Sequence, residues 1–137
     1  MVSSSPQILL DGAHNFIAAR HLARYLSEYL SDRNITLLIG ILDDKPYKAI
    51  LKDLLPLCQK VILIRPKIDR ALAPEKLYPV AQKIISDIHV IPDVDKAIIY
   101  AIENASPKDV ICIAGSLYVV GEAKELFEKR ADLFRNN

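Results

Sequence analysis

Five short apolar runs, each followed by a longer segment of helical period, constrain the fold of this chain most strongly. The runs are rich in Ile, Val and Leu with little polar alternation, and they cover residues 8–10, 35–41, 61–64, 89–91 and 110–114. Strands buried on both faces have this composition, because helices cover each face of a parallel sheet. The pattern therefore predicts five strands of a mostly parallel sheet.

The segments between the runs repeat apolar residues every three or four positions, which places those residues on one stripe of an amphipathic helix. The expected stripes are Ala19, Leu22, Leu26 and Tyr29; Tyr47, Ile50 and Leu54; Leu77, Val80 or Ala81, and Ile84; Val94, Ile98, Ala101 and Ala105; and Leu117, Val120, Phe127, Ala131 and Phe134. Pro46 and Pro74 suit the first turns of their helices. Asp93 and Ser116 suit N-cap positions.

Strands that alternate with helices, joined by short connections, define an α/β fold. We therefore predict a Rossmann-like α/β domain with a mostly parallel open sheet and helices on both faces. The domain is expected to span residues 7–137, and residues 1–6 are expected to form a flexible lead-in. A single domain fits the 137 residues, since no internal repeat or linker divides them.

The composition excludes several classes of protein. The 18 Lys and Arg and 17 Asp and Glu are spread along the chain, so no basic surface for nucleic acid is expected. No apolar run approaches the roughly 18 residues that span a membrane.

Cys58 and Cys112 adjoin apolar runs, which is typical of reduced, buried thiols in a cytoplasmic protein. No Cys–His spacing typical of a metal site is present, so the chain is expected to bind no metal by itself.

Ligands of open α/β sheets bind beyond the carboxyl ends of the strands, so the strand-to-helix loops are the candidate sites. The first such loop, residues 11–15, is the most informative. Asn15 can cap the following helix and leave His14 at its amino end, where free N–H groups and the helix dipole favour a phosphate. Gly12 lets a ligand approach the backbone closely. Asp11 can accept a hydrogen bond from a ribose hydroxyl or, equally, form an Asx-type turn.

The other loops carry polar groups that are open to two interpretations. Ser116 and Tyr118 follow the fifth run, and Ser116 suits a simple N-cap better than a ligand contact. After the second run, Asp43 and Asp44 can hold a hydrated cation, although Pro46 favours capping of the next helix. After the third run, basic side chains can meet phosphates or remain solvated; they are Arg65, Lys67 and Arg70.

Motifs of a complete nucleotide-using enzyme are missing. The sequence contains no G-x-x-x-x-G-K-[ST] phosphate loop, no G-x-G-x-x-G fingerprint and no G-x-S-x-G nucleophile elbow. His21 lies seven residues after His14, which does not fit the four-residue spacing of a helical metal site. His89, at the start of a strand, is expected to serve packing. The expected sheet therefore lacks a phosphate cradle of its own.

Four segments resemble motifs of folylpolyglutamate and dihydrofolate synthases, enzymes of the Mur ligase superfamily. Residues 10–15, LDGAHN, are similar to the L-D-x-A-H-N-P motif that opens the last domain of those enzymes, with Phe16 in place of the proline. Residues 40–45, GILDDK, resemble the G-x-x-x-D-K stretch, and residues 69–71, DRA, resemble the R-A stretch. Residues 109–118, DVICIAGSLY, resemble the D-x-x-x-x-x-G-S-L-Y segment. The resemblance covers nearly the whole chain.

The resemblance implies the carboxy-terminal domain of an ATP-dependent ligase that joins L-glutamate to folates, making dihydrofolate, folylpolyglutamates or both. In such enzymes a folate carboxylate takes the γ-phosphate of ATP, and the amine of glutamate attacks the acyl phosphate. The phosphate loop and the Mg²⁺ ligands lie in an amino-terminal ATPase domain. That domain is the implied partner, and without it the chain is expected to be inactive.

By position, the resemblance also implies roles for particular residues. Asp11 and Asn15 are expected to bind ATP, and His14 is expected to bind ATP and act at the acyl-phosphate centre. Ser116 and Tyr118 are expected to bind glutamate. Two alternatives remain open. One is the carboxy-terminal domain of another Mur-type amide ligase, whose motifs differ from A-H-N and G-S-L-Y; the other is a non-catalytic α/β ligand-binding module.

Overall fold

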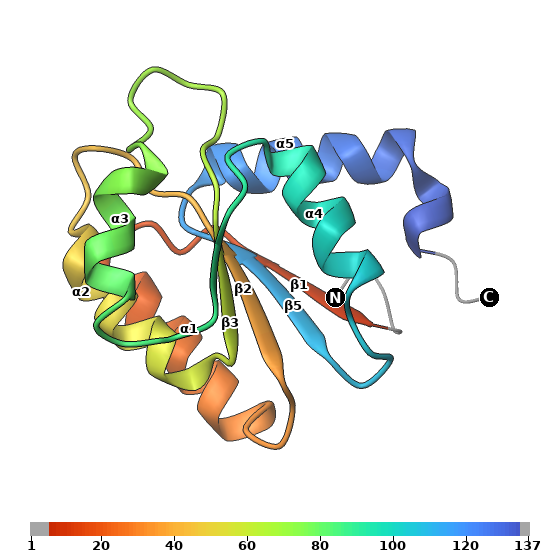
Figure 1. Cartoon of the computed structure of the whole chain (residues 1–137), viewed down its shortest axis with the longest axis horizontal. Coiled ribbons are helices and arrows are strands. Elements are labelled where there is room, and N and C mark those ends of the chain that lie inside the picture. Colours follow the sequence, from red (N-terminus) through yellow and green to blue (C-terminus); the bar gives the residue numbers. More distant parts are fainter. Residues whose placement is uncertain (1–5, 135–137) are drawn as a thin grey trace.

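A parallel five-stranded sheet forms the centre of the molecule, as the computed structural model, which describes residues 6–134, shows (Figure 1). The strands are β1 Gln7–Asp11, β2 Ile35–Ile39, β3 Lys60–Leu63, β4 Ile88–Val90 and β5 Val110–Ala114. Their order across the sheet is β1-β5-β2-β3-β4, and each pairing of neighbouring strands is parallel. The predicted Rossmann-like sheet is confirmed. The expected lead-in, residues 1–6, lies outside the described residues except for Pro6.

Helices cover both faces of this sheet, as predicted. They are α1 Phe16–Tyr29, α2 Tyr47–Leu54, α3 Pro74–Ala81, α4 Val94–Glu103 and α5 Leu117–Lys129, with short 3-10 turns at Leu55–Leu57 (η1) and Ala131–Phe134 (η2). Apart from Pro74, the buried residues of α1, α2 and α3 belong to one hydrophobic cluster, and those of α4 and α5 belong to a second. The first three helices therefore pack on one face and the last two on the other (Figure 1).

Successive strand residues alternate between these two clusters. In β2, Leu37 and Ile39 join the α1–α3 cluster, whereas Leu38 joins the α4–α5 cluster. Each of these side chains is 0% exposed. Because both faces are covered, both sets of residues must be apolar, which explains why the runs in the sequence show little polar alternation.

Three of the residues expected at helix starts occupy the predicted positions, and Pro46 does not. Asp93 and Ser116 are N-caps, and the side chain of each accepts a hydrogen bond from a backbone N–H three residues later at 3.0 Å. Pro74 is the first residue of α3. Pro46 stands one position outside the first turn of α2, at the N-cap, because Tyr47 is the first helical residue.

Some details at helix ends differ from the prediction. Tyr29 and Leu117 were expected on apolar stripes but are 67% and 68% exposed. They are the last residue of α1 and the first of α5, so they lie at helix ends rather than over the middle of the sheet. Periodicity alone does not report where a helix passes the edge of the sheet.

The predicted helices over residues 77–84 and 117–134 are too long. α3 ends at Ala81, and Ile84 packs against the core from the turn that follows. α5 ends at Lys129, and Ala131 begins a separate 3-10 turn with an exposed side chain. The side chain of Phe134 lies outside the described residues.

Candidate functional site

The carboxyl edge of the sheet contains a topological switch point at β5. This strand lies between β1 and β2, and α5, which follows it, packs on the opposite face from α1 and α2. The loops that leave these strands therefore diverge to opposite faces, and this arrangement creates a ligand-binding crevice in open α/β sheets. The register aligns Asp11, Ala114 and Ile39 at this edge.

Glycines allow the loops at this edge to approach one another closely. Gly115 has a φ of +114°, and a Cβ atom there would lie 2.2 Å from the carbonyl oxygen of Gly40. A Cβ atom on Gly12 would lie 2.7 Å from the Cδ2 atom of Leu117. The loop after β5 therefore touches the loops after β1 and β2, as expected for loops that share one edge of a parallel sheet.

The loop after β1 forms both of the local structures that its sequence predicts. Asn15 caps α1, and its side-chain oxygen accepts a hydrogen bond from the N–H of Ala18 at 2.8 Å. The Asp11 carboxylate accepts a hydrogen bond from the N–H of Ala13 at 2.8 Å, which is the Asx-type turn. The turn engages Oδ1 only, so Oδ2 keeps its capacity to accept a hydrogen bond from a ligand.

Partial burial shapes the electrostatics of this loop. Desolvation raises the pKa of Asp11 above its ordinary value of 3.8, although the hydrogen bond from Ala13 acts in the opposite direction. His14 belongs to the same loop, and its Nδ1 atom is 2.7 Å from the carbonyl oxygen of Gly12. Because a carbonyl oxygen only accepts, Nδ1 carries the proton, and Nε2 is left to accept one or to bind a ligand.

The amino end of α1 fits a phosphate group. The helix is 14 residues long and has no acidic residue in its first turn. The positive end of its dipole is therefore not neutralised by its own side chains, and its other first-turn N–H groups have no acceptor within the helix. These groups, together with Asp11 and His14, suit the phosphates and the ribose of a nucleotide.

The loop after β5 separates its two candidate residues. Ser116 is 1% exposed, and its Oγ atom accepts a hydrogen bond from the N–H of Val119, so the interpretation as an N-cap is confirmed. Tyr118 is 48% exposed and lines a pocket of about 410 Å³. Charges of both signs line it as well, from Lys67, Lys129, Asp95, Glu122 and Glu125. Ser116 therefore holds the start of the helix, and Tyr118 offers its phenol at the surface.

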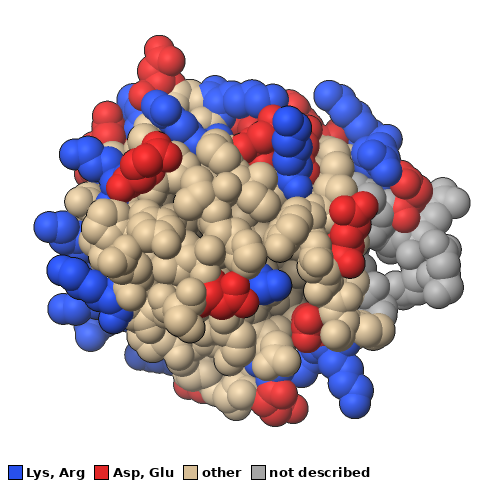
Figure 2. Space-filling view, in the orientation of Figure 1, with Lys and Arg blue, Asp and Glu red and all other residues tan. Residues whose placement is uncertain are grey.

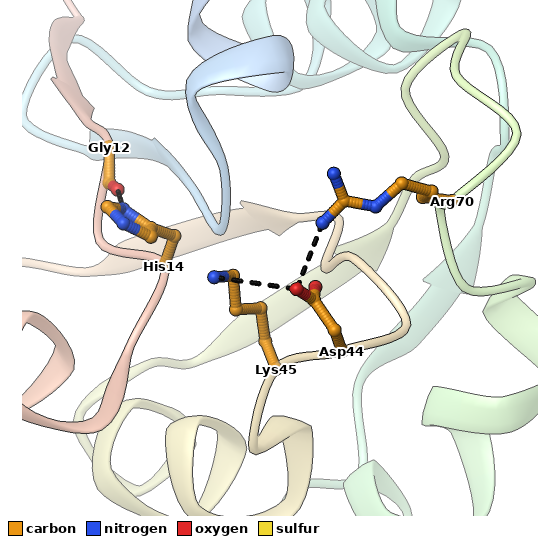
Figure 3. Close-up of polar contacts among 5 residues, drawn as sticks. All are labelled: Gly12, His14, Asp44, Lys45 and Arg70. Carbon is orange, nitrogen blue, oxygen red and sulfur yellow. Dashed lines mark hydrogen bonds and ion pairs between the residues drawn. The ribbon is translucent and has the colours of Figure 1, made fainter.

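An ion-pair cluster in the loops after β2 and β3 was not predicted from the sequence. Asp44 Oδ2 lies 3.0 Å from Arg70 Nη2 and 3.8 Å from Lys45 Nζ (Figure 3). The backbone ties the two loops together, since the N–H of Asp43 donates to the carbonyl oxygen of Arg70 at 2.7 Å. Figure 3 shows the Lys45 side chain extending from its loop toward the side on which His14 lies.

The expectation that Asp43 or Asp44 caps the next helix is wrong. The N-cap of α2 is Pro46, and it makes no side-chain cap hydrogen bond. Asp44 instead shares its carboxylate between two cations. Desolvation acts against ionisation, but the hydrogen bond and charge of Arg70 and the charge of Lys45 lower the pKa of Asp44 below its ordinary value. The motif resemblance over residues 40–45 and 69–71 was the signal in the sequence that marked these loops.

Arg70 and Lys67 of the loop after β3 have different partners, whereas Arg65 and Lys67 line one pocket. Arg70 joins Asp44, as described above. The N–H of Lys67 donates to the Glu122 carboxylate on α5 at 2.6 Å, which places Lys67 beside the pocket at Tyr118. The loop over residues 65–70 therefore contacts both the loop after β2, through Arg70, and α5, through Lys67.

Other titratable groups are explained by packing. The ring of His89 lies 5.5 Å from that of Tyr100, and its Nε2 atom is 2.8 Å from the Asp87 carboxylate, in agreement with the predicted packing role. Cys58 and Cys112 are free and buried. Burial raises the pKa of Cys58 to about 12 and that of Cys112 well above its ordinary value.

The described residues were also searched for clusters of metal-binding side chains. Within residues 6–134, no group of three or more His, Cys, Asp or Glu side chains is arranged to hold a metal ion. A search of the same residues for a helix long and apolar enough to cross a membrane also found none.

Comparison with known proteins shows the family to which a chain with this fold and candidate site belongs. The sequence profile of the family described as "Mur ligase, glutamate ligase domain" matches residues 1–117. The chain belongs to this family.

Within this family, the chain is similar to several named proteins. A dihydrofolate synthase/folylpolyglutamate synthase from Bacillus subtilis is 26% identical over 125 residues, which make up 91% of this chain and 29% of the relative. A folylpolyglutamate synthase from Mycobacterium tuberculosis, solved with ADP, matches with a TM-score of 0.84 and 27% identity over 92% of this chain and 31% of that one. FolC of Escherichia coli, also solved with ADP, shares the fold with a TM-score of 0.87 and 24% identity over 96% of this chain and 31% of that one.

These neighbours agree with the motif resemblance seen in the sequence. The chain spans only 29% to 31% of the length of the relatives compared, so it corresponds to one domain of a larger enzyme in each.

Proposed function

We propose that this chain is the carboxy-terminal domain of an ATP-dependent ligase that adds L-glutamate to folates. The observation that carries this proposal is the open amino end of α1 at the switch point, with Asp11 and His14 beside it and Asn15 as its N-cap. The relatives named as folylpolyglutamate and dihydrofolate synthases, among them one solved with ADP, support the same reaction class.

The loop after β1 has the chemistry for the nucleotide side of the reaction. Free N–H groups at the start of α1 can donate hydrogen bonds to phosphate oxygens, and Asp11 Oδ2 can accept a hydrogen bond from a ribose hydroxyl. His14 Nε2 can take a proton from the attacking amine or, once protonated, donate to a phosphate oxygen. ATP supplies the γ-phosphate that activates the folate carboxylate, and Mg²⁺ would be held by the ATPase domain.

Glutamate is proposed to bind on the side of the loop after β5. Tyr118 contributes a phenol to the pocket there, and Lys67 and Lys129 can meet the carboxylates of glutamate. The pocket is also lined by carboxylates that can meet the ammonium group of glutamate; they belong to Asp95, Glu122 and Glu125. Because the Ser116 hydroxyl already caps α5, we assign Ser116 chiefly to positioning the helix that carries Tyr118.

The partner in this proposal is an amino-terminal ATPase domain, which supplies the phosphate loop that this sequence lacks. Phe16, Ile17 and Leu117 are 42%, 68% and 68% exposed at the starts of α1 and α5, beside the nucleotide loop. An apolar rim around a polar site is typical of a surface that another domain covers. Closure there would exclude water from the acyl phosphate. The proposed enzyme is cytoplasmic.

The test is ATP turnover that depends on both a folate and glutamate, measured for the full-length protein. Asp11→Ala and His14→Ala are each expected to lower kcat by on the order of 100-fold, because each removes a group that acts on the reacting centre or positions it. Asp32→Ala and His21→Ala are matched controls, since both residues are exposed and lie outside the loop after β1. Turnover within twofold of the parent is expected for both controls.

Three outcomes would contradict the proposal. Unchanged turnover in Asp11→Ala or His14→Ala would remove the role assigned to that residue. No turnover by the full-length protein with any folate would overturn the reaction class. Turnover by the 137-residue chain alone would overturn its dependence on an ATPase domain.

A further inference from the structure

A groove on the outer surface of the molecule lies between α2 and α3, away from the crevice at β5. Its volume is about 390 Å³, and it is lined by Lys48, Ala49 and Lys52 of α2, Val80 of α3, and Lys83 and Ile84 just beyond α3. Figure 2 shows Lys and Arg side chains gathered along the left edge of the molecule, where Figure 1 places these two helices.

The lining combines positive charge with an apolar floor. Lys48, Lys52 and Lys83 are exposed, no acidic residue lines the groove, and within residues 6–134 none of these lysines forms an ion pair. Val80 and Ile84 pack against the hydrophobic core, so the floor is fixed. Elsewhere the two signs of charge are mixed, and the net charge of the chain is only +1. The groove therefore presents local positive charge that nothing within the described residues neutralises.

Such a surface complements a flexible chain of carboxylates joined by methylene groups. The carboxylates would meet the lysines at the rim, and the methylene groups would lie on the apolar floor. A small anion such as phosphate would use the charge but not the floor. An oligo-γ-glutamate, the tail of a folylpolyglutamate, has both features.

In the proposed reaction the terminal γ-carboxylate of the tail reacts in the crevice. The position of the groove suits the glutamate residues that precede this terminal residue. α2 begins two residues after Lys45, so Lys48 is within one turn of the loop that bears the ion-pair cluster. In this parallel topology α2 and α3 both run from the carboxyl edge of the sheet toward its amino edge. An eight-residue helix extends about 12 Å. The groove therefore leads away from the site over a distance of several side chains.

We propose that this groove binds the oligo-γ-glutamate tail of the folate substrate or product. The inference rests on the proposed function, because it takes the tail from that reaction. It adds a binding site outside the crevice that discriminates substrates by tail length.

A direct binding experiment tests the site without requiring catalysis. Fluorescein-labelled penta-γ-glutamate is titrated with the 137-residue chain and with the full-length protein, and fluorescence polarisation is recorded. The triple variant Lys48→Gln, Lys52→Gln and Lys83→Gln is expected to weaken binding about tenfold or more, since each exposed ion pair contributes a modest amount. The matched control replaces three exposed lysines outside the groove, Lys76, Lys96 and Lys108, with Gln and changes the net charge equally.

Kinetics in the full-length protein separate this inference from the proposed function. The groove variant is expected to raise KM about tenfold for a pentaglutamate folate and to leave kcat and KM for the monoglutamate unchanged. Turnover with folates but equal KM values for the variant and the parent would overturn the groove alone. An absence of folate turnover in the parent protein would overturn the proposed function, and the binding titration would still decide the groove.

Specificity is the remaining control. Equal losses in the groove variant and the control variant would show non-specific attraction of a polyanion and would overturn the site. So would single-stranded RNA that competes as well as penta-γ-glutamate at equal charge. Competition by oligo-γ-glutamate that strengthens with tail length, lost only in the groove variant, would support it.

Discussion

Among single residues, Asp11 shows most clearly how a site residue can weaken the fold that carries it. Its carboxyl is half-buried, and desolvation raises its pKa above the ordinary value of 3.8. The folded state therefore disfavours the ionised form. The stability associated with the protonated form is complete below about pH 3.8 and is lost as the pH rises through the raised pKa.

We predict that Asp11→Asn makes the chain more stable at pH 7 and leaves its stability unchanged at pH 3. The amide oxygen keeps an acceptor for the N–H of Ala13, but it brings no charge into the half-buried position. Urea unfolding at the two pH values measures the difference, with Asp32→Asn as the exposed control. An equal change at both pH values would show that desolvation of Asp11 is not its cause. If the full-length protein is the proposed ligase, the same substitution is expected to reduce its turnover, so that stability and activity move in opposite directions.

Among the elements, α5 and the loop before it contain two glycines that differ in whether a side chain fits at their position. Gly115 precedes its N-cap, has a positive φ, and lies against the backbone of Gly40. Gly121 lies in the helix interior, where a Cβ atom would meet nothing within 4 Å. The first glycine is required by the close approach of two loops, and the second is not required by any contact of the described structure.

We predict opposite effects of alanine at these two positions. Gly115→Ala is expected to destabilise the fold by at least about 3 kcal/mol, because it adds backbone strain to a steric clash with a carbonyl group. Gly121→Ala is expected to stabilise it by about 0.5–1 kcal/mol, because alanine favours the helix. Chemical denaturation of both variants gives the two values. An unchanged free energy of unfolding in Gly115→Ala would mean that the loops after β2 and β5 are not in contact. It would contradict the arrangement of loops that forms the crevice.

The elements also show which features a sequence can predict. Ser116 was identified as an N-cap because its partner is three residues away, and β5 was identified because burial on both faces makes a strand uniformly apolar. The exposed position of Leu117 was missed, since helical period does not reveal how far a helix overhangs the sheet. The pairing of Asp44 with Arg70 was missed because it joins residues 26 positions apart. Most local interactions were predictable, although the expected capping by Asp43 or Asp44 was wrong, and interactions that depend on the order of strands were not predictable.

For the whole molecule, the insertion of β5 between β1 and β2 has two consequences. It assembles the loops of the candidate site from opposite ends of the chain, through the pairings of β5 with both neighbours. It also places Cys112 on an interior strand, between β1 and β2, with 0% of its surface exposed. The candidate site therefore depends on β5, the last strand in the sequence. The reactivity of the Cys112 thiol measures whether β5 is paired with its neighbours.

The two cysteines should consequently react at different stages of unfolding. Cys58 is 8% exposed, its Sγ donates to the carbonyl oxygen of Leu54, and its pKa is raised to about 12, so at pH 8 little thiolate forms. It follows η1, outside the strands, so local opening can expose it. Cys112 is expected to need global unfolding. Iodoacetamide labelling in rising urea, with each cysteine peptide quantified by mass spectrometry, should show Cys58 modified first and Cys112 only with the global transition. Equal labelling of the two cysteines under native conditions would mean that β5 detaches easily, and a crevice built on it would then not be preformed.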